Sequence, residues 1–244
     1  MEKKYELTDE ILEVGGHVLH RIKALRDFGN VKKGDIGGWI ECEDNLSHDD
    51  DCWVYDEATI CDNATICDNA TVRDEATVWD NATVRGEATV CDNATVRDNA
   101  TVRGETTVRD NATVRDNATI CDNATVRGEA TVWDNATVRD NATICDNATV
   151  WDNATVRGEA TVWDNATICG EATVENKSDY IVFKNWWSSG RYFTWTRSND
   201  MWSVGCFYGT GEELIKKAYN DSDESGREYE RIVKYVESIK QEFK

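Results

Sequence analysis

Histidine is the residue type in this sequence best suited to acid–base chemistry or metal binding, and there are only three: His17, His20 and His48. In a strand, alternation would place the rings of His17 and His20 on opposite faces, which is poor geometry for holding one metal ion. All three histidines precede the repetitive part of the chain. The sequence therefore predicts no histidine base within the repeats.

Nine cysteines are the other reactive side chains. Residues 52–177 contain no C-x-x-C motif and no cysteine–histidine cluster, which argues against a metal site there. The cysteines of this region also lack a partner in register for a disulfide. We therefore expect nine free thiols, as in a reducing cytoplasm, with neither a metal nor a cofactor.

Other catalytic motifs are missing as well. The chain has no nucleotide-binding loop, no nucleophile elbow and no paired-carboxylate motif. From these absences the sequence predicts a protein that is not an enzyme and has no catalytic residue.

A six-residue period fills residues 52–177, which we call the rod. The hexad is A-T-V-x-D-N, with Ile for Val and G-E or D-E for D-N in places, and 21 hexads cover the 126 residues. An α-helix has about 3.6 residues per turn, so valines that recur every six residues would not lie on one face of it. A short strand with Ala and Val on one side, followed by a corner of Asp-Asn or Gly-Glu, fits it. Stacked strands of this kind form a parallel β-solenoid, in which proline would delete a ladder hydrogen bond, and the sequence contains no proline.

The hexad resembles the motif of hexapeptide-repeat proteins, in which a small residue lies four places after an aliphatic one, as Ala58 does after Val54. That resemblance implies a left-handed β-helix of triangular section. Three hexads per coil would give about seven coils and a rod roughly 34 Å long. We therefore predict a mainly β fold: a single-stranded parallel β-helix with an N-terminal β cap and a small C-terminal α+β domain.

The predicted N-terminal cap is residues 1–51. Residues 4–7 and 11–14 have the pattern of strands, Gly15-Gly16 that of a tight turn, and residues 17–25 that of a returning strand. The string D-F-G-N-V-K-K-G-D-I-G-G-W at residues 27–39 resembles the opening segment of bacterial and prophage-borne hexapeptide-repeat proteins of the YdcK type. This resemblance implies a fold and brings no assigned chemistry.

The predicted C-terminal domain is residues 178–244. We expect three aromatic strands, at residues 180–183, 192–195 and 202–207. Two capping boxes, Thr210 with Glu213 and Ser225 with Glu228, predict the starts of two helices. This domain is similar to tails attached to hexapeptide-repeat proteins in phage and prophage genomes.

The outward position x of the hexad varies mainly among Arg, Cys and Trp. Codons for these residues can differ by single bases, so the variation fits drift in a duplicated repeat. It also fits a contact surface, because Trp and Arg are common interface anchors. On the second interpretation, and with the tryptophans of the C-terminal domain, the candidate binding residues are Trp79, Arg97, Arg115, Trp133, Trp151, Trp163, Trp186 and Trp187.

The formal charge of −20 is unevenly distributed: −13 lies on the rod, −6 on the cap and −1 on the C-terminal domain. This balance argues against direct binding of nucleic acid, because such proteins neutralise phosphates with Lys and Arg. The rod carries about two-thirds of the net linear charge of DNA, which suggests imitation of nucleic acid. The plainer interpretation is an acidic surface that keeps a repetitive β-protein in solution.

The leading functional hypothesis is a non-catalytic binding protein of phage or prophage type that engages and inhibits a host protein, such as a nucleic-acid-binding or defence protein. One alternative is a structural scaffold that polymerises end to end. Another is an oligomeric sponge for a small anionic ligand, which would use Arg85, Arg103, Arg139 and Arg157.

The expected location is the cytoplasm of a bacterial host. The apolar runs are too short for a membrane span, and the N-terminus lacks the apolar core of a signal peptide. We expect no membrane partner. The aromatic residues of the C-terminal domain make a homo-oligomer through that domain a further expectation.

Overall fold

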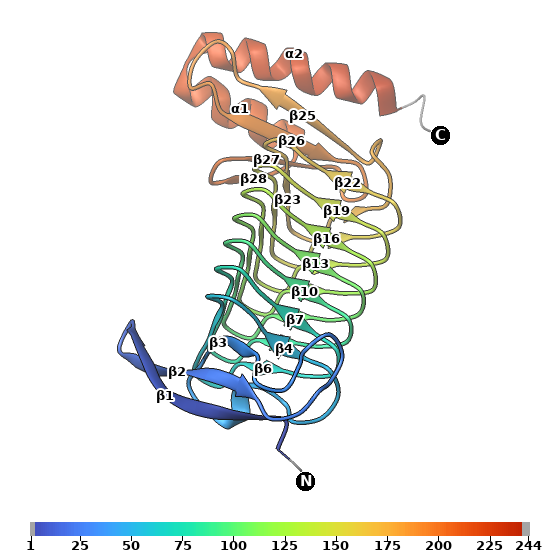
Figure 1. The fold of residues 1–244 in the computed structure, drawn as a ribbon. Coiled ribbons are helices and arrows are strands. Elements are labelled where there is room, and N and C mark those ends of the chain that lie inside the picture. Colours follow the sequence, from blue (N-terminus) through green and yellow to red (C-terminus); the bar gives the residue numbers. More distant parts are fainter. Residues whose placement is uncertain (1–2, 241–244) are drawn as a thin grey trace.

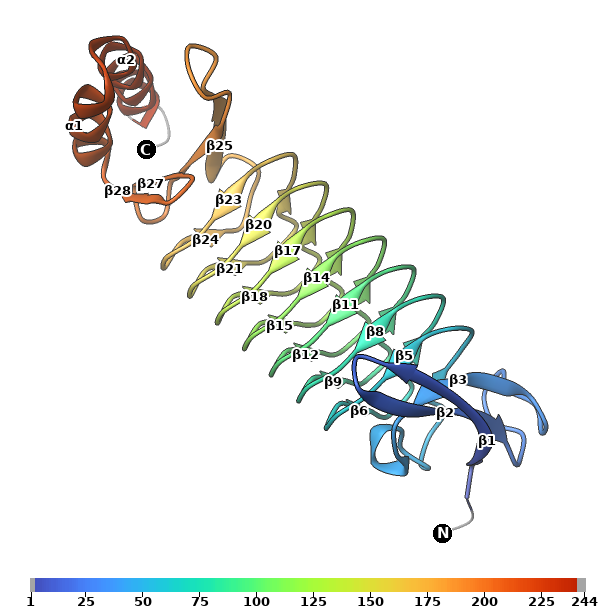
Figure 2. The same ribbon diagram turned by 90° about the vertical axis from the view of Figure 1, so that its left-hand side faces the viewer.

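The structure is a computed structural model that describes residues 3–240. A stack of coils forms the rod, with a β-hairpin at its N-terminal end and a small sheet with two helices at its C-terminal end (Figures 1 and 2). The predicted class, a mainly β fold with a parallel β-solenoid, is confirmed.

Three sheets make up the solenoid, and every strand of the rod is two residues long. The first sheet contains β1 (Tyr5–Val14), β2 (His17–Ala24), β3 (Ile36–Ile40), β5 (Thr59–Ile60), β8 (Thr77–Val78), β11 (Thr95–Val96), β14 (Thr113–Val114), β17 (Thr131–Val132), β20 (Thr149–Val150) and β23 (Thr167–Ile168). The second contains β4 (Trp53–Val54), β7 (Thr71–Val72), β10 (Thr89–Val90), β13 (Thr107–Val108), β16 (Thr125–Val126), β19 (Thr143–Ile144) and β22 (Thr161–Val162). The third contains β6 (Thr65–Ile66), β9 (Thr83–Val84), β12 (Thr101–Val102), β15 (Thr119–Ile120), β18 (Thr137–Val138), β21 (Thr155–Val156) and β24 (Thr173–Val174).

The hexad explains this arrangement residue by residue. Ala and Val or Ile point into the core and are fully buried in coil after coil, whereas Thr points outward. The corner Asp has a left-handed backbone, with φ of +60° at Asp92 and +62° at Asp110. Its carboxylate also accepts the N–H of the next corner, because Asp110 N donates to Asp92 Oδ2 at 3.2 Å. Asp at the corner therefore fits both the turn and the stacking of coils.

The solenoid has about eight turns, one more than the 21 hexads supply. β3 pairs in parallel with β5, and Leu46, which follows the 3₁₀-helix η1 (Glu43–Asn45), forms a parallel bridge with Ile66. Residues 36–46 thus begin the stack without the repeat pattern, so the sequence estimate of seven coils was too low.

At the strand ends and corners, the hydrogen bonds between coils run in one direction, which gives the two ends of the solenoid different capping requirements. At these positions each coil donates its N–H groups to carbonyls of the next, as Thr59 N does to Ala76 O at 3.0 Å. The N-terminal end therefore presents carbonyls, and the buried Lys4 donates from Nζ to Cys52 O at 2.9 Å and Asp49 O at 3.2 Å. Because the N-terminal end is capped in this way, open end-to-end stacking would first have to displace this cap.

The C-terminal end presents N–H groups and receives acceptors. Thr167 N donates to Thr194 Oγ1 at 2.9 Å, and Thr173 N donates to Ser198 Oγ at 2.7 Å. Thr194 belongs to the four-stranded sheet that covers this end, and Ser198 lies in the turn that follows the second strand of that sheet (Figure 1).

Close backbone contacts explain the two glycines of the G-G-W string in the cap. A Cβ on Gly37 would lie 2.6 Å from Val54 O, and one on Gly38 would lie 2.6 Å from Ala58 O. Only glycine allows the chain to enter the first coil this closely. Trp39 then pairs with Thr59 in the sheet, and its Nε1 donates to Glu57 Oε2 at 2.9 Å.

The predicted hairpin of the cap is confirmed. β1 and β2 pair antiparallel, and Gly15 and Gly16 at the turn have φ of +61° and +97°. The register shifts between Leu7 and Ile11, which marks an irregularity in the middle of β1.

The C-terminal sheet has four antiparallel strands where three were predicted: β25 (Tyr180–Lys184), β26 (Tyr192–Thr196), β27 (Met201–Val204) and β28 (Phe207–Gly209). The expected strand at residues 202–207 is wrong because Gly205, with φ of +56°, turns the chain back on itself.

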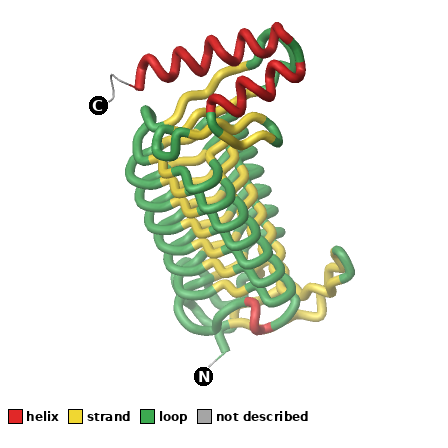
Figure 3. Tube along the Cα trace, turned by 180° about the vertical axis from the view of Figure 1, so that it is seen from behind, coloured by secondary structure: helices red, strands yellow, loops and turns green. Residues whose placement is uncertain are grey.

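Two helices, α1 (Gly211–Asp221) and α2 (Asp223–Lys240), lie over this sheet (Figure 3). The capping box of Thr210 and Glu213 is confirmed. The second predicted box is wrong, because Ser225 lies inside α2 and its N–H donates to Ser222 Oγ at 3.1 Å. Neither helix is long and apolar enough to cross a membrane, as judged over residues 3–240.

Candidate active site

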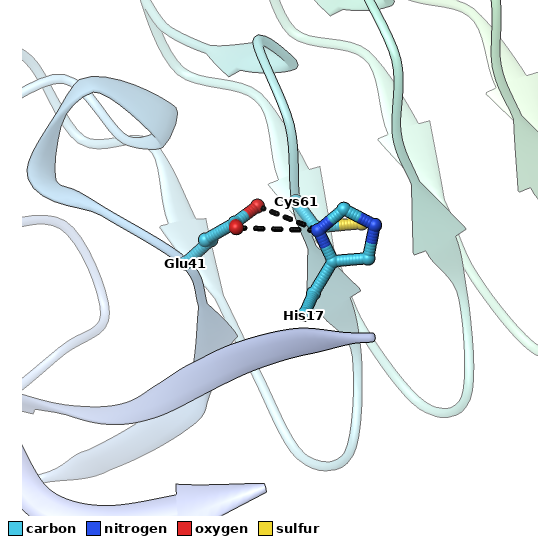
Figure 4. A group of neighbouring side chains, drawn as sticks. All are labelled: His17, Glu41 and Cys61. Carbon is cyan, nitrogen blue, oxygen red and sulfur yellow. Dashed lines mark hydrogen bonds and ion pairs between the residues drawn. The ribbon is translucent and has the colours of Figure 1, made fainter. Parts of the chain in front are cut away.

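The hairpin brings His17 back onto the first coils of the rod, where it meets Glu41 and Cys61 (Figure 4). His17 opens β2, Glu41 follows β3 and Cys61 follows β5. These three strands are consecutive neighbours in the first sheet, so residues far apart in the sequence lie side by side. The prediction of no histidine base within the repeats missed this contact, because the pairing of β2 with β3 could not be inferred from the hexads.

Glu41 holds the imidazole of His17. Nδ1 of His17 lies 3.2 Å from each carboxylate oxygen of Glu41, and Nε2 lies 3.8 Å from Oδ1 of Asp62. The backbone N–H of Asp62 donates to Glu41 Oε2 at 2.7 Å, which fixes the carboxylate in turn. About 30% of each of the three side chains is exposed, so solvent reaches the cluster.

The pKa values of the three side chains in the cluster are shifted by this geometry. The hydrogen bond to Glu41 raises the pKa of His17 above its usual value, and Asp62 adds to the effect. The N–H of Asp62 lowers the pKa of Glu41, and His17 contributes. Burial raises the pKa of Cys61 to about 12, with Asp62 and Glu41 adding to it. At neutral pH, Glu41 is therefore a carboxylate and Cys61 a protonated thiol.

An apolar cleft of about 240 Å³ lies beside the imidazole. Leu19 and Trp79 provide apolar surface: Leu19 belongs to a small buried cluster with Cys61, and the half-buried Trp79 packs against that cluster. Thr59 and Thr77 supply the polar part of the wall, and Thr59 Oγ1 hydrogen-bonds to Thr77 Oγ1 at 3.3 Å. The residues that line the cleft are Val14, Gly15, His17, Leu19, Thr59, Cys61, Thr77 and Trp79.

Two kinds of chemistry suit this arrangement. A histidine oriented by a carboxylate can act as a general base towards a substrate in the cleft. Alternatively, the nitrogen, oxygen and sulfur donors of the three side chains are ligand types that transition metals bind.

Five of the candidate binding residues form a column on the first sheet. The Arg97 guanidinium lies 5.6 Å from the ring of Trp79, and the Arg115 guanidinium lies 4.3 Å from that of Trp133. Trp133 stacks on Trp151, with ring centroids 5.0 Å apart and an interplanar angle of 6°. All five side chains are half-buried. Only Trp79 reaches the cleft.

The other three candidates lie elsewhere. Trp163 follows β22 on the second sheet and is 53% exposed. Trp186 is 74% exposed, whereas its neighbour Trp187 packs edge-on against Tyr229, with ring centroids 5.1 Å apart. The eight residues therefore do not make one surface.

All nine cysteines are free, as the sequence predicts. His17, Glu41 and Cys61, however, were not candidates, because each lies in a different part of the sequence and only Cys61 belongs to the hexads. His20 has a different partner from His17, namely the carbonyl of Thr8 at 3.2 Å.

No protein-family model matches the sequence. A stretch of 40 residues is 42% identical to a protein named "Uncharacterized acetyltransferase YdcK" from Escherichia coli (strain K12). The match covers 16% of this chain and only 12% of that relative. The relative's name contradicts the expectation that the protein is not an enzyme. What is shown is a β-solenoid that resembles, over a short stretch, a protein named as an acetyltransferase.

Proposed function

We propose that the protein is an acyltransferase in which His17 is the general base. The observation that carries this proposal is the His17–Glu41 pair at the wall of an apolar cleft. The similarity to a relative named as an acetyltransferase supports the same class of reaction.

The two nitrogens of His17 have separate roles in this reaction. Glu41 accepts the Nδ1–H hydrogen bond, which leaves Nε2 to remove a proton from the hydroxyl or amine of an acceptor. The acceptor attacks the carbonyl carbon of an acyl thioester, and the thiolate leaves with the proton that Nε2 had taken. Asp62, 3.8 Å from Nε2, stabilises the imidazolium between these two steps.

The cleft supplies the remaining groups. Its apolar surface at Leu19 and Trp79 suits an aliphatic segment of the donor or the acceptor. When Thr59 donates its hydroxyl proton to Thr77, the hydroxyl of Thr77 is free to donate to the oxygen that gains charge at the thioester carbonyl. Cys61 does not act as the nucleophile, because its raised pKa keeps the thiol protonated.

The test measures transfer of a labelled acetyl group from acetyl-coenzyme A to a panel of amines and alcohols, together with hydrolysis of the thioester. His17→Asn should reduce the rate by about 10²–10⁴-fold, the usual contribution of a general base. His20→Asn is the matched control, because His20 lies on the same strand and its Nδ1 hydrogen-bonds to the backbone carbonyl of Thr8 and not to Glu41. Failure of the wild-type protein to consume the thioester, or full activity of His17→Asn, would refute the proposal.

A second candidate function is the engagement of a host protein by the acidic rod, and the stacked corner carboxylates favour it. Such binding is compatible with enzymatic activity. A pull-down from host lysate at low and high salt would test it, because electrostatic capture should weaken as salt rises. The left-handed sense of the solenoid and an origin in phage or prophage genomes stay predictions.

A further inference from the structure

Three donor atoms of different chemistry converge between β2, β3 and β5. They are a ring nitrogen of His17, a carboxylate oxygen of Glu41 and the sulfur of Cys61, and all lie within 4.8 Å of one another (Figure 4). An ion with tetrahedral bonds of about 2.0 Å has ligand atoms about 3.3 Å apart. The measured distance of 3.2 Å from His17 Nδ1 to Glu41 Oε1 agrees with that spacing.

We propose that His17, Glu41 and Cys61 bind one thiophilic divalent metal ion, of which zinc is the representative. A site with one nitrogen, one oxygen and one sulfur donor suits zinc better than magnesium or calcium, which prefer oxygen ligands alone. Three protein ligands leave a coordination position for water or another small ligand.

Asp62 already supplies the outer contacts that such a site needs. Metal-bound histidines usually present their second ring N–H to a carboxylate, and Nε2 of His17 faces Oδ1 of Asp62 at 3.8 Å. The backbone N–H of Asp62 also donates to Glu41 Oε2 at 2.7 Å, which leaves Oε1 for the ion. Both arrangements are present in the structure without the ion, so binding would require little rearrangement of these two ligands.

Charge also favours a dication. Glu41 and Asp62 carry negative charge beside the sulfur, and the Asp80 carboxylate contributes to the potential at His17. When the ion binds, Cys61 loses its thiol proton and Nδ1 of His17 loses its proton if it carries one, and both are released to solvent. The bound thiolate and Glu41 then neutralise the two positive charges of the ion.

The metal site does not depend on the proposed acyl transfer. An ion on Nδ1 would displace the hydrogen bond to Glu41 and leave the proton of the imidazole on Nε2. His17 could then not act as a base, so zinc would inhibit acyl transfer. The experiment below reads absorbance and heat, and it can therefore succeed even if no transferase activity is found.

The test titrates the full-length protein with Co²⁺ and follows the thiolate-to-cobalt charge-transfer absorption, with zinc affinity measured by calorimetry. We expect one ion per chain. Cys61→Ser should abolish the charge-transfer band, and Asp62→Asn should weaken zinc binding by about 10–100-fold.

Cys145→Ser is the matched control, because Cys145 occupies the same hexad position in a later coil, is also buried and also lies beside an aspartate, Asp146. This variant should keep both the band and the affinity. If Cys61→Ser does not fold, His17→Asn replaces it, since His17 is partly exposed. Absence of binding to the wild-type protein, or an unchanged band in Cys61→Ser or His17→Asn, would overturn the proposal.

Discussion

From residue 70 onward, Thr106 is the one residue of its column in the rod that is not alanine. Its neighbours one coil away are Ala88 and Ala124, both fully buried. Thr106 itself is 1% exposed, and its Oγ1 has no hydrogen-bond partner among the described residues. A buried hydroxyl without a partner has lost its hydrogen bonds to water and gained none in the protein.

We therefore expect Thr106→Val to stabilise the protein. The substitution keeps the branched shape and removes the hydroxyl, whose unmet hydrogen bonding costs about 1–3 kcal/mol. Thr106→Ala also removes the hydroxyl but gives up a buried methyl group, which contributes about 0.8 kcal/mol. The free energy of unfolding should thus rise most for valine and less for alanine.

Urea unfolding measures this difference through the midpoint at unchanged slope, and calorimetry should show a rise of about 2–4 °C in Tm for each kcal/mol. Thr107→Val is the matched control. Thr107 is the next residue and points outward, so its substitution should change the free energy by no more than about 0.5 kcal/mol. The reasoning is refuted if Thr106→Val is no more stable than the wild type, or if Thr107→Val gains as much.

Two further predictions concern the cap. Lys4→Met should lower the free energy of unfolding in urea by about 1–3 kcal/mol, because the carbonyls of Cys52 and Asp49 lose their donor, whereas the exposed Lys33→Met should not. The backbone N–H of Lys33, helped by Lys32, lowers the pKa of Asp27 below its usual 3.8, so an NMR titration should find Asp27 ionised to lower pH than in an unfolded peptide. Its stabilising contribution should be complete above pH 3.8 and disappear as pH falls through the native pKa; a native pKa at or above 3.8 would contradict this.

Most of the fold was predictable from the sequence because the hexad is a local rule repeated without interruption. Ala and Val at alternate positions define the core, and a corner residue that tolerates positive φ closes each side, so each hexad specifies one strand and one turn. The C-terminal domain shows where local rules fail. Gly205 splits an apparently continuous strand, and Ser225 has the pattern of a cap but lies inside a helix that begins at Asp223.

The candidate site could not be predicted in the same way. His17, Glu41 and Cys61 belong to three segments with different patterns, and no spacing in the sequence relates them. They meet because β2 pairs with β3 and β3 pairs with the first strand of its column, β5, so their positions depend on long-range hydrogen bonding.

By itself, the sequence determined that residues 52–177 form a parallel β-solenoid with an alanine and valine core and acidic corners. A period of six with β-branched residues leaves strand and turn as the only fitting local structure. Only the tertiary structure decided that a hairpin outside the repeats would place a histidine against the first coils. That placement follows from which strand edges pair and from the absence of a Cβ at Gly37 and Gly38, which lets β3 approach the coil.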